Sequence, residues 1–176
     1  MEFIEKNIKG VYEILLSVKG DERGWLARTY CANVFKEKAG INDFFVQANH
    51  TFTLEKGTIR GLHYQIEPHS ELKLIRCIRG KVFDVAVDLR EKSPTFLHYI
   101  SIELSPENNN MFLIPKGCAH GFQTLTSDCE MLYLHSAFYS PEFERGCRYD
   151  DPKINIQFPL IPTVISQRDQ QHPFLT

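Results

Sequence analysis

Apolar and polar residues alternate along several short stretches of this chain, a period of two that is typical of β-strands with one buried face. The clearest case is KVFDVAVDL at residues 81–89. Its apolar residues fall on one face and its two aspartates on the other: Phe83, Val85, Val87 and Leu89 against Asp84 and Asp88. We therefore expect a strand at 81–89 with only its apolar face buried.

The preceding segment, LKLIRCIRG at residues 72–80, predicts a second strand. Arg79-Gly80-Lys81 supplies a turn between the two segments, so together they predict a β-hairpin. The alternation continues in four segments separated by proline, glycine, asparagine or aspartate: 98–105, 110–115, 121–126 and 130–139. Only CANVFKEKAG, residues 31–40, has a helical pattern, which ends at its glycine.

Many short strands at this spacing predict a mainly β fold, a jelly-roll β-sandwich or barrel with a few short helices. At 176 residues the chain has the length of one domain with a substantial core. We expect a single domain over residues 1–176. Its jelly-roll core is expected at about 20–140, and a C-terminal segment at about 141–176 is expected to wrap the surface.

Composition narrows the possible partners and compartments. The formal net charge of −2 provides no basic field for nucleic acid or for an anionic membrane. Apolar runs are far shorter than the roughly 20 residues of a membrane span, and the charged N-terminus does not look like a signal peptide. The five cysteines are scattered without a CxxC pair, which argues against a zinc ribbon or a complete disulfide framework. We expect reduced thiols, a cytoplasmic location, and no nucleic-acid or membrane partner.

Five polar side chains interrupt the apolar strands and are candidates for a functional cavity: Arg60, His63, Lys73, His120 and Tyr133. In a small barrel one face of each strand lines the interior, so such residues can converge on one pocket. The alternative is that each of them alternates outward into solvent, which is the commoner outcome for a single residue. Five of them, beside glycine turns or at strand centres, favour the pocket.

A metal site is one possible use of these histidines. Cupin-type barrels often bind a divalent ion through a His-x-His pair, a carboxylate and a later histidine, because borderline metals favour imidazole nitrogen. The candidate ligands here are His63, His69, Glu71 and His120. The chain has no His-x-His, and Pro68 interrupts a regular strand between the first two histidines. We therefore expect no metal and no other cofactor.

Acid–base chemistry is the other possible use. A histidine abstracts protons near neutral pH, most effectively when a carboxylate holds its tautomer and stabilises the imidazolium. Removing a proton from the carbon beside a ketone creates an enolate, whose oxygen needs a nearby lysine or arginine. Returning the proton to the opposite face needs an acid such as tyrosine. His63, Lys73 and Tyr133 are the right residue types, whereas the local sequence does not identify the carboxylate.

Five motifs follow one another along the chain: GTIRGLHYQ (57–65), ELKLIRCIRGKVFDVAVDLREKSPTF (71–96), LIPKGCAHGFQTL (113–125), PEFERGCRYDDP (141–152) and ISQRD (165–169). With GDERGW near residue 20, they closely resemble the nucleotide-sugar 3,5-epimerases of the dTDP-4-dehydrorhamnose 3,5-epimerase type, over nearly the whole chain. The resemblance implies a cupin-like jelly roll, a homodimer and cofactor-free chemistry on a nucleotide-linked 4-keto-6-deoxy sugar. It also implies a cytoplasmic enzyme that supplies precursors, such as dTDP-rhamnose, for polysaccharide biosynthesis.

Carried over motif by motif, the resemblance implies catalytic roles. His63 looks like the general base, Asp169 like the carboxylate that orients it, and Tyr133 like the proton donor. Lys73, with Arg60, resembles the residues beside the sugar and its ketone oxygen. The remaining positions resemble those that bind the rest of the substrate: Arg23, Arg28, Gln47, Asn49, His120, Tyr139, Glu144 and Arg168.

The chain departs from the family pattern at several of these positions. Arg28 stands where a glutamate is common and Ala48 where an aspartate is common, which bears on the nucleotide preference. His135, on the same strand face as the expected proton donor, and Phe138, where tyrosine is frequent, could tune which carbon is epimerised. A homodimer could also exchange N-terminal strands and so place Arg23 or Arg28 in the neighbour's pocket.

Three alternatives to a double epimerase stay open. They are a mono-epimerase acting at C3 or C5 alone, a metal-dependent cupin oxygenase or isomerase, and a non-catalytic sugar-binding cupin.

One geometric condition applies to the pocket itself. Arg60 and His63 are three positions apart and would face opposite sides of a regular strand. Because Gly61 makes a bulge easy, we predict a bulge, bend or turn at 60–62.

Overall fold

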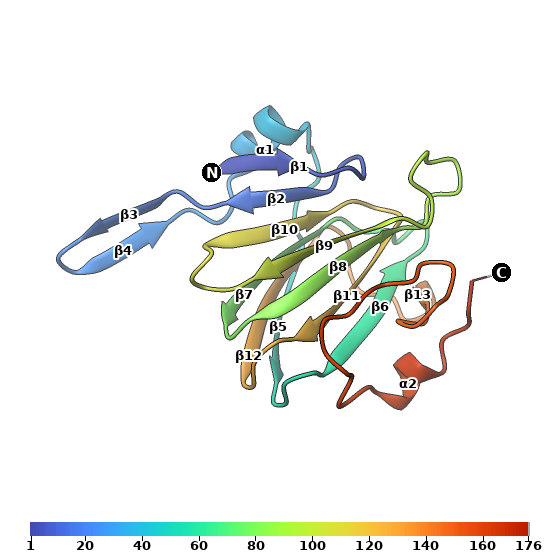
Figure 1. Ribbon diagram of the computed structural model, residues 1–176. Helices are drawn as coiled ribbons and strands as arrows, with labels where there is room; N and C mark the ends of the chain where they lie inside the picture. The colour runs from blue at the N-terminus through green and yellow to red at the C-terminus, as the bar shows by residue number, and fades with distance from the viewer. Residues whose placement is uncertain (176) are drawn as a thin grey trace.

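The computed structural model describes residues 1–175 and consists mainly of two antiparallel sheets packed face to face (Figure 1). The first sheet has the order β1-β2-β10-β7-β12-β5: β1 (Glu2–Glu5), β2 (Tyr12–Leu15), β10 (Asn110–Ile114), β7 (Lys73–Arg79), β12 (Cys129–His135) and β5 (Gln47–Thr53). The second has the order β13-β6-β11-β8-β9: β13 (Glu144–Gly146), β6 (Ile59–Gln65), β11 (Cys118–Thr124), β8 (Val82–Asp88) and β9 (Tyr99–Leu104). The expected mainly β, jelly-roll-like fold is confirmed.

The main hydrophobic core lies between the two sheets. It is built from the inward-facing residues of both, among them Ile75, Val82, Leu104, Phe112 and Phe122, all of them almost fully buried. Burying one side chain of this size contributes about 1.5–3 kcal/mol relative to leaving it exposed. This core holds the sheets at a fixed separation, so polar residues that also point between the sheets are held in a rigid frame.

The outer face of each sheet is covered by a different end of the chain. Helix α1 (Ala32–Ala39), predicted at 31–40, ends at Gly40 in the left-handed conformation, and its Phe35 packs with the N-terminal strands and the outer side chains of β7 and β10. The C-terminal segment packs Ile154 and Ile156 onto the outer face of β8. The described residues form two helices, α1 and the short α2 (Gln167–Gln170). Neither helix is long and apolar enough to cross a membrane.

The predicted β-hairpin at residues 72–89 is wrong. Strands β7 and β8 occur where expected, but β7 pairs with β10 and β12 in one sheet, whereas β8 pairs with β9 and β11 in the other. Gly80, at φ +75°, turns the chain across the sandwich instead of back along the same sheet. Since a short glycine turn suits either connection, the local sequence could not distinguish them.

The expectation that β8 has only one buried face is also wrong. Its valines at 85 and 87 pack beneath the C-terminal segment, while its aspartate face points into the sandwich. Asp84 and Asp88 are both fully buried. Each carboxylate has a partner: Asp88 accepts from Arg90 Nε at 2.7 Å, and Asp84 Oδ1 lies 2.8 Å from His120 Nε2. The residues that cover the outer face of β8 come from much later in the chain, so the local pattern of residues 81–89 could not reveal that this face is buried.

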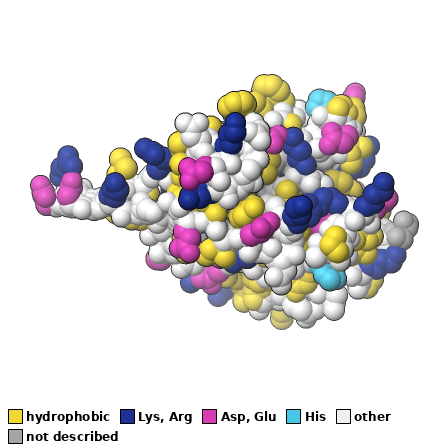
Figure 2. Space-filling model, turned by 90° about the horizontal axis from the view of Figure 1, so that it is seen from above, with side chains coloured by type: hydrophobic (Ala, Val, Ile, Leu, Met, Phe, Trp, Pro, Cys, Tyr) yellow, Lys and Arg dark blue, Asp and Glu magenta, His cyan; other side chains and the backbone are white. Residues whose placement is uncertain are grey.

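The N-terminal residues contribute more to the fold than expected. Strands β1 and β2 belong to the six-stranded sheet, so the core begins well before residue 20, the start expected from the sequence. Strands β3 (Val18–Asp21) and β4 (Gly24–Ala27) pair only with each other and form an arm that projects from the body (Figures 1 and 2). At the other end, Thr176, the last residue of the expected wrapping segment, lies outside the described residues.

The predicted irregularity at residues 60–62 is confirmed. On β6 and β11 the register runs from His63 opposite His120 to Gly61 opposite Gly121, so β6 carries one extra residue at this point. Gly61 has φ +116°, a backbone conformation that residues with a side chain rarely adopt. The extra residue turns Arg60 and His63 toward the same pocket, which a regular strand could not do.

Replacing Gly61 with alanine tests this constraint. A Cβ on Gly61 would lie 2.6 Å from the Cα of Gly121 and 2.7 Å from the carbonyl oxygen of His120. We expect Gly61→Ala to lower the free energy of unfolding by about 2 kcal/mol or more, measured by urea denaturation. The matched control is Gly24→Ala, at φ +126° with open space around it, which adds the dihedral strain without the collision. Equal destabilisation by the two variants would contradict close packing at the bulge.

Candidate active site

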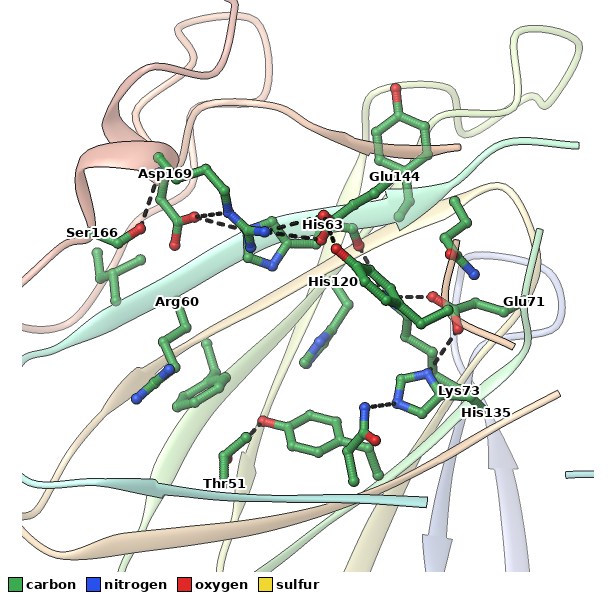
Figure 3. A pocket seen from close by; sticks show the side chains of 18 of the residues that line it. Thr51, Arg60, His63, Glu71, Lys73, His120, His135, Glu144, Ser166 and Asp169 are labelled. Carbon is green, nitrogen blue, oxygen red and sulfur yellow. Dashed lines mark hydrogen bonds and ion pairs between the residues drawn. The ribbon is translucent and has the colours of Figure 1, made fainter. Parts of the chain in front are cut away.

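A pocket of about 620 Å³ opens between the two sheets (Figure 3). This volume is within the usual range for small-molecule sites. Its lining comes from β6 and β11 on one side, from β5, β7 and β12 on the other, and from α2 and the residues around it. Most of the residues expected from the sequence lie on its wall: Gln47, Asn49, Arg60, His63, Lys73, His120, Tyr133, Tyr139, Glu144, Arg168 and Asp169.

Two expected substrate-binding residues are not in the pocket of their own chain. Arg23 lies at the tip of the arm between β3 and β4, ion-paired with Asp21, and Arg28 directly follows β4 and is exposed. No pattern in this part of the chain indicated that these two strands leave the sandwich. Both arginines therefore lie away from the pocket of their own chain, and their expected role in substrate binding stays a prediction.

Helix α2 brings Asp169 against His63, which lies 106 residues earlier. Ser166 caps the helix by accepting a hydrogen bond from the backbone N–H of Asp169 at 3.1 Å. The carboxylate is almost fully buried: Oδ2 accepts from the N–H of Gly61 at 3.0 Å, and Oδ1 lies 2.8 Å from Nε2 of His63. This is the carboxylate that the local sequence could not identify, because it sits on a different segment from the imidazole.

The protonation of this pair follows from its hydrogen bonds. Burial on its own would raise the pKa of Asp169, but the bonds from His63 and from the Gly61 N–H outweigh it and lower the pKa to about 2. An ionised carboxylate only accepts, so Nε2 of His63 carries the donated proton, and in the neutral ring with this tautomer Nδ1 has the lone pair. Arg168 lies 3.0 Å from the same Nε2 and does not hydrogen-bond to it in this tautomer.

Tyr133 occupies the opposite wall. It belongs to β12 of the six-stranded sheet, and its hydroxyl lies 3.5 Å from Oγ1 of Thr51 on β5. Figure 3 shows Thr51 and His63 on opposite sides of the pocket, so the phenol and the imidazole reach it from the two different sheets. Burial raises the pKa of Tyr133, with the Thr51 contact acting in the other direction, so the phenol keeps its proton at neutral pH.

Lys73, on β7, supplies a buried cation between these walls. Its Nζ donates to the backbone carbonyl of His63 at 3.1 Å and lies 3.2 Å from Oε1 of Glu71. An ammonium has three N–H donors, so one is left for a ligand. Arg60 is nearby on β6 and is held by bonds to Oγ1 of Thr53 at 3.0 Å and to the carbonyl of Phe52 at 3.2 Å.

His120 forms a second buried histidine–aspartate pair inside the sandwich. Its Nε2 lies 2.8 Å from Oδ1 of Asp84, and both side chains are buried. Burial raises the pKa of Asp84 and lowers that of His120, so both shifts favour the uncharged forms. Asp84 lies on the strand face predicted to be solvent-exposed, which is why sequence reasoning did not include it in the site.

Other pocket residues were also missed or left without a role. Thr51 was not identified at all, and Glu71 was considered only as a metal ligand. His172 does not line the pocket, but it packs edge-to-face against the His63 ring, with centroids 5.5 Å apart, and its Nε2 is 3.8 Å from Oδ1 of Asp169. The pairing of Glu71 with His135 joins two segments far apart in the chain, so only the strand register could have revealed it.

The four residues considered as metal ligands do not converge. His69 lies outside the pocket, and the other three are each bonded to a different side chain. A different trio, His63, Asp169 and His172, has potential ligand atoms within 4.8 Å of one another. The guanidinium of Arg168, 3.0 Å from Nε2 of His63, places a positive charge beside this trio and opposes a bound cation there.

The depressed pKa of Asp169 gives a testable pH dependence. The stabilisation is fully present above the ordinary pKa of 3.8 and is lost as the pH falls through about 2. We therefore expect Asp169→Asn to lower the free energy of unfolding at pH 7 by roughly 2 kcal/mol, and the difference from wild type to shrink below about pH 4. Urea denaturation across this pH range measures it, with Asp128→Asn, on a turn outside the pocket, as the control. A difference that stays constant down to about pH 2 would contradict the assignment.

Comparisons with known proteins show the family of this chain. The family model of dTDP-4-dehydrorhamnose 3,5-epimerase matches residues 5–176. The dTDP-4-dehydrorhamnose 3,5-epimerase of Shigella flexneri is 43% identical over 169 residues, covering 96% of this chain and 93% of the relative.

Solved structures give the same result. The crystal structure of dTDP-4-dehydrorhamnose 3,5-epimerase from Elizabethkingia anophelis superposes with a TM-score of 0.94 at 37% identity, covering 98% of this chain and 95% of that one. A second solved structure is dTDP-6-deoxy-D-glucose-3,5-epimerase from Legionella pneumophila in complex with dTDP-4-keto-L-rhamnose. It superposes with a TM-score of 0.92 at 39% identity and covers 97% of this chain and 90% of that one. The resemblance found in the sequence is confirmed: this chain is an epimerase that belongs to the dTDP-4-dehydrorhamnose 3,5-epimerase family.

Proposed function

We propose that this protein epimerises a dTDP-linked 4-keto-6-deoxyhexose at C3 and C5 without a cofactor. The observation that carries the proposal is the two-sided pocket, with a carboxylate-bound imidazole on one sheet and a protonated phenol on the other. Inversion at carbon needs a base on one face of the sugar and an acid on the opposite face. The ligand named for the Legionella structure, dTDP-4-keto-L-rhamnose, is a compound of this class.

In the first step His63 removes the proton from the carbon beside the ketone. Nδ1 accepts the proton, and the electron pair of the C–H bond moves to the C4 oxygen to form the enolate. Asp169 stabilises the imidazolium through Nε2, at 2.8 Å. The free N–H of Lys73 donates to the enolate oxygen, with Arg60 nearby. One oxyanion donor of this kind is typically worth about 10²–10³-fold in rate.

In the second step Tyr133 gives its proton to the carbon from the opposite face. The enolate collapses to the ketone. The tyrosinate then takes up a proton from solvent, and the His63 imidazolium releases to solvent the proton that it removed. The raised pKa of Tyr133 supports this role, because the phenol is protonated before the step. Asn49, Gln47 and the Tyr139–Glu144–Arg168 group are proposed to hold the nucleotide diphosphate, since guanidinium groups chelate phosphates and amides orient bases.

Two variants separate the base from the acid. We expect His63→Asn to reduce solvent deuterium incorporation at C5 and C3 of dTDP-4-keto-6-deoxyglucose by about 10²-fold or more. Tyr133→Phe is expected to keep some solvent exchange while suppressing inversion, because the base still works and the opposite-face acid is gone. NMR in D₂O reads both outcomes. His98→Asn, an exposed histidine outside this pocket, is the control.

The same measurement distinguishes the rival functions. Label at only one of the two carbons would identify a mono-epimerase. Exchange that chelators abolish would identify a metal-dependent enzyme, and nucleotide-sugar binding without exchange would identify a non-catalytic cupin. Near-normal exchange by His63→Asn would show that the base has been assigned to the wrong residue.

We further propose a homodimer in which the arm of β3 and β4 contacts the partner. The arm carries exposed Trp25 and Leu26, 60% and 68% exposed, and such apolar surface on a projecting hairpin suits burial against a second copy. The arm also holds Arg23, with Arg28 at its base, away from its own pocket. Both are therefore proposed to reach the partner's pocket and its nucleotide.

Charged residues on the arm test the dimer. We expect the double variant Trp25→Glu with Leu26→Glu to convert the dimer to a monomer in analytical ultracentrifugation, because burying two carboxylates costs several kcal/mol. Ile161→Glu, at a residue that is 89% exposed elsewhere, is the control. A wild-type protein that sediments as a monomer at micromolar concentration would contradict the proposal.

The cytoplasm is the proposed location. All five cysteines are free thiols in the described part of the chain, which suits a reducing compartment. Nucleotide sugars of this type are precursors of rhamnose-containing polysaccharides, and we propose that pathway as the destination of the product.

A further inference from the structure

One wall of the pocket carries a continuous chain of hydrogen bonds that runs from its mouth to Lys73. At the mouth, the backbone N–H of Tyr139 donates to Oε1 of Gln47 at 3.0 Å, and Nε2 of Gln47 donates to Oδ1 of Asn49 at 3.3 Å. Nδ2 of Asn49 then lies 3.3 Å from Nε2 of His135. Inside the pocket, Nδ1 of His135 lies 2.8 Å from Oε2 of Glu71.

The direction of this chain is fixed by its two ends. A backbone N–H only donates, so Gln47 must present its oxygen to Tyr139 and its amide nitrogen to Asn49. Asn49 in turn presents its nitrogen to His135, whose Nε2 must accept. At the other end a carboxylate only accepts, so Nδ1 of His135 must donate to Glu71. The two ends together therefore require one form of His135, the neutral ring with its proton on Nδ1.

Glu71 ends the chain beside Lys73. Its side chain is 8% exposed, and its two oxygens are divided between His135 and Nζ of Lys73, the latter at 3.2 Å. Burial would raise the pKa of Glu71, but the His135 bond and the Lys73 charge lower it, so the group is a carboxylate. Figure 3 shows Glu71 between these two partners. A buried carboxylate and a buried ammonium stabilise each other only while both are held in good geometry.

We propose that His135 and Glu71 are positioning residues that aim the free N–H of Lys73 at the C4 oxygen of the sugar. This inference rests on the proposed function. Lys73 donates one N–H to the carbonyl of His63 and one to Glu71, and these two bonds fix the direction of its third N–H. His135 holds Glu71 in turn, and its orientation depends on the residues proposed to bind the nucleotide.

The same geometry separates His135 from the proposed base. His63 bonds its carboxylate through Nε2 and leaves Nδ1 with a free lone pair. His135 bonds its carboxylate through Nδ1, and its Nε2 lone pair is occupied by the amide of Asn49. These two of the three histidine–carboxylate pairs at the pocket therefore have different roles: the His63 pair moves a proton, and the His135 pair holds a cation in place.

The first test reads the tautomer of His135 without reference to activity. Two-bond ¹H–¹⁵N NMR spectra of the uniformly labelled wild-type protein, with His135→Gln used to assign the signal, distinguish Nδ1–H, Nε2–H and doubly protonated rings. We expect the Nδ1–H form at pH 7.5. An Nε2–H or a doubly protonated ring would overturn the inference, because neither can accept from Asn49 while donating to Glu71.

The second test reads the consequence for Lys73. We expect His135→Leu and Glu71→Gln each to lower kcat by about 10-fold or more, with a much smaller change in dTDP affinity measured by calorimetry. In His135→Gln the amide can both donate and accept, and we expect it to recover most of the loss. The matched control is His50→Leu on β5, which removes a similar histidine–glutamate contact, 2.9 Å to Glu130, on the outside of the same sheet.

The outcomes separate the two proposals. Wild-type protein that shows no solvent exchange with the sugar would end the proposed function itself. Wild-type exchange together with folded His135→Leu and Glu71→Gln variants of unchanged kcat would end only the role of this pair. A loss in kcat equal to that of His50→Leu would likewise show that the pair serves the stability of the sheet alone.

Discussion

The structure depends on one contact, the hydrogen bond between Nε2 of His63 and the carboxylate of Asp169. It joins strand β6 of the five-stranded sheet to a four-residue helix near the end of the chain. The same carboxylate also accepts from the N–H of Gly61, so it fixes both the imidazole and the bulge beside it. Without that bulge, His63 and Arg60 could not face the same pocket. The carboxylate of Asp169 therefore fixes three things together: the orientation of the base, the path of β6 and the position of the C-terminal segment.

A sandwich of two sheets is well suited to inversion at carbon, because its interior has two independent walls. The main core fixes the distance between the sheets, and each sheet then presents its own side chains to a ligand held between them. The imidazole comes from the five-stranded sheet and the phenol from the six-stranded one. The two groups also differ in environment. The imidazole is polarised by a buried anion, whereas burial holds the phenol in its protonated form.

The sequence predicted most of the strands, the helix at 31–40 and the irregularity at 60–62, since each depends on residues close together in the chain. It also supplied the pairing of His63 with Asp169, although only through the family motifs. The hairpin at 72–89 failed because a tight turn does not specify which sheet the next strand joins. Asp84 was placed on the wrong side because the segment that covers the other face of β8 comes much later in the chain. The pairing of Glu71 with His135 was missed for the same reason, since it depends on the register of β7 and β12.

A crystal structure with an unreactive dTDP-linked hexose bound would test the central claim most directly. The quantities to measure are the distances from the epimerised carbon to Nδ1 of His63 and to the hydroxyl oxygen of Tyr133. We expect both to be about 3–3.5 Å, the spacing of reacting atoms, with the two groups on opposite faces of the sugar ring. A ring that presents the same face to both residues, or a carbon out of reach of the imidazole, would contradict the account.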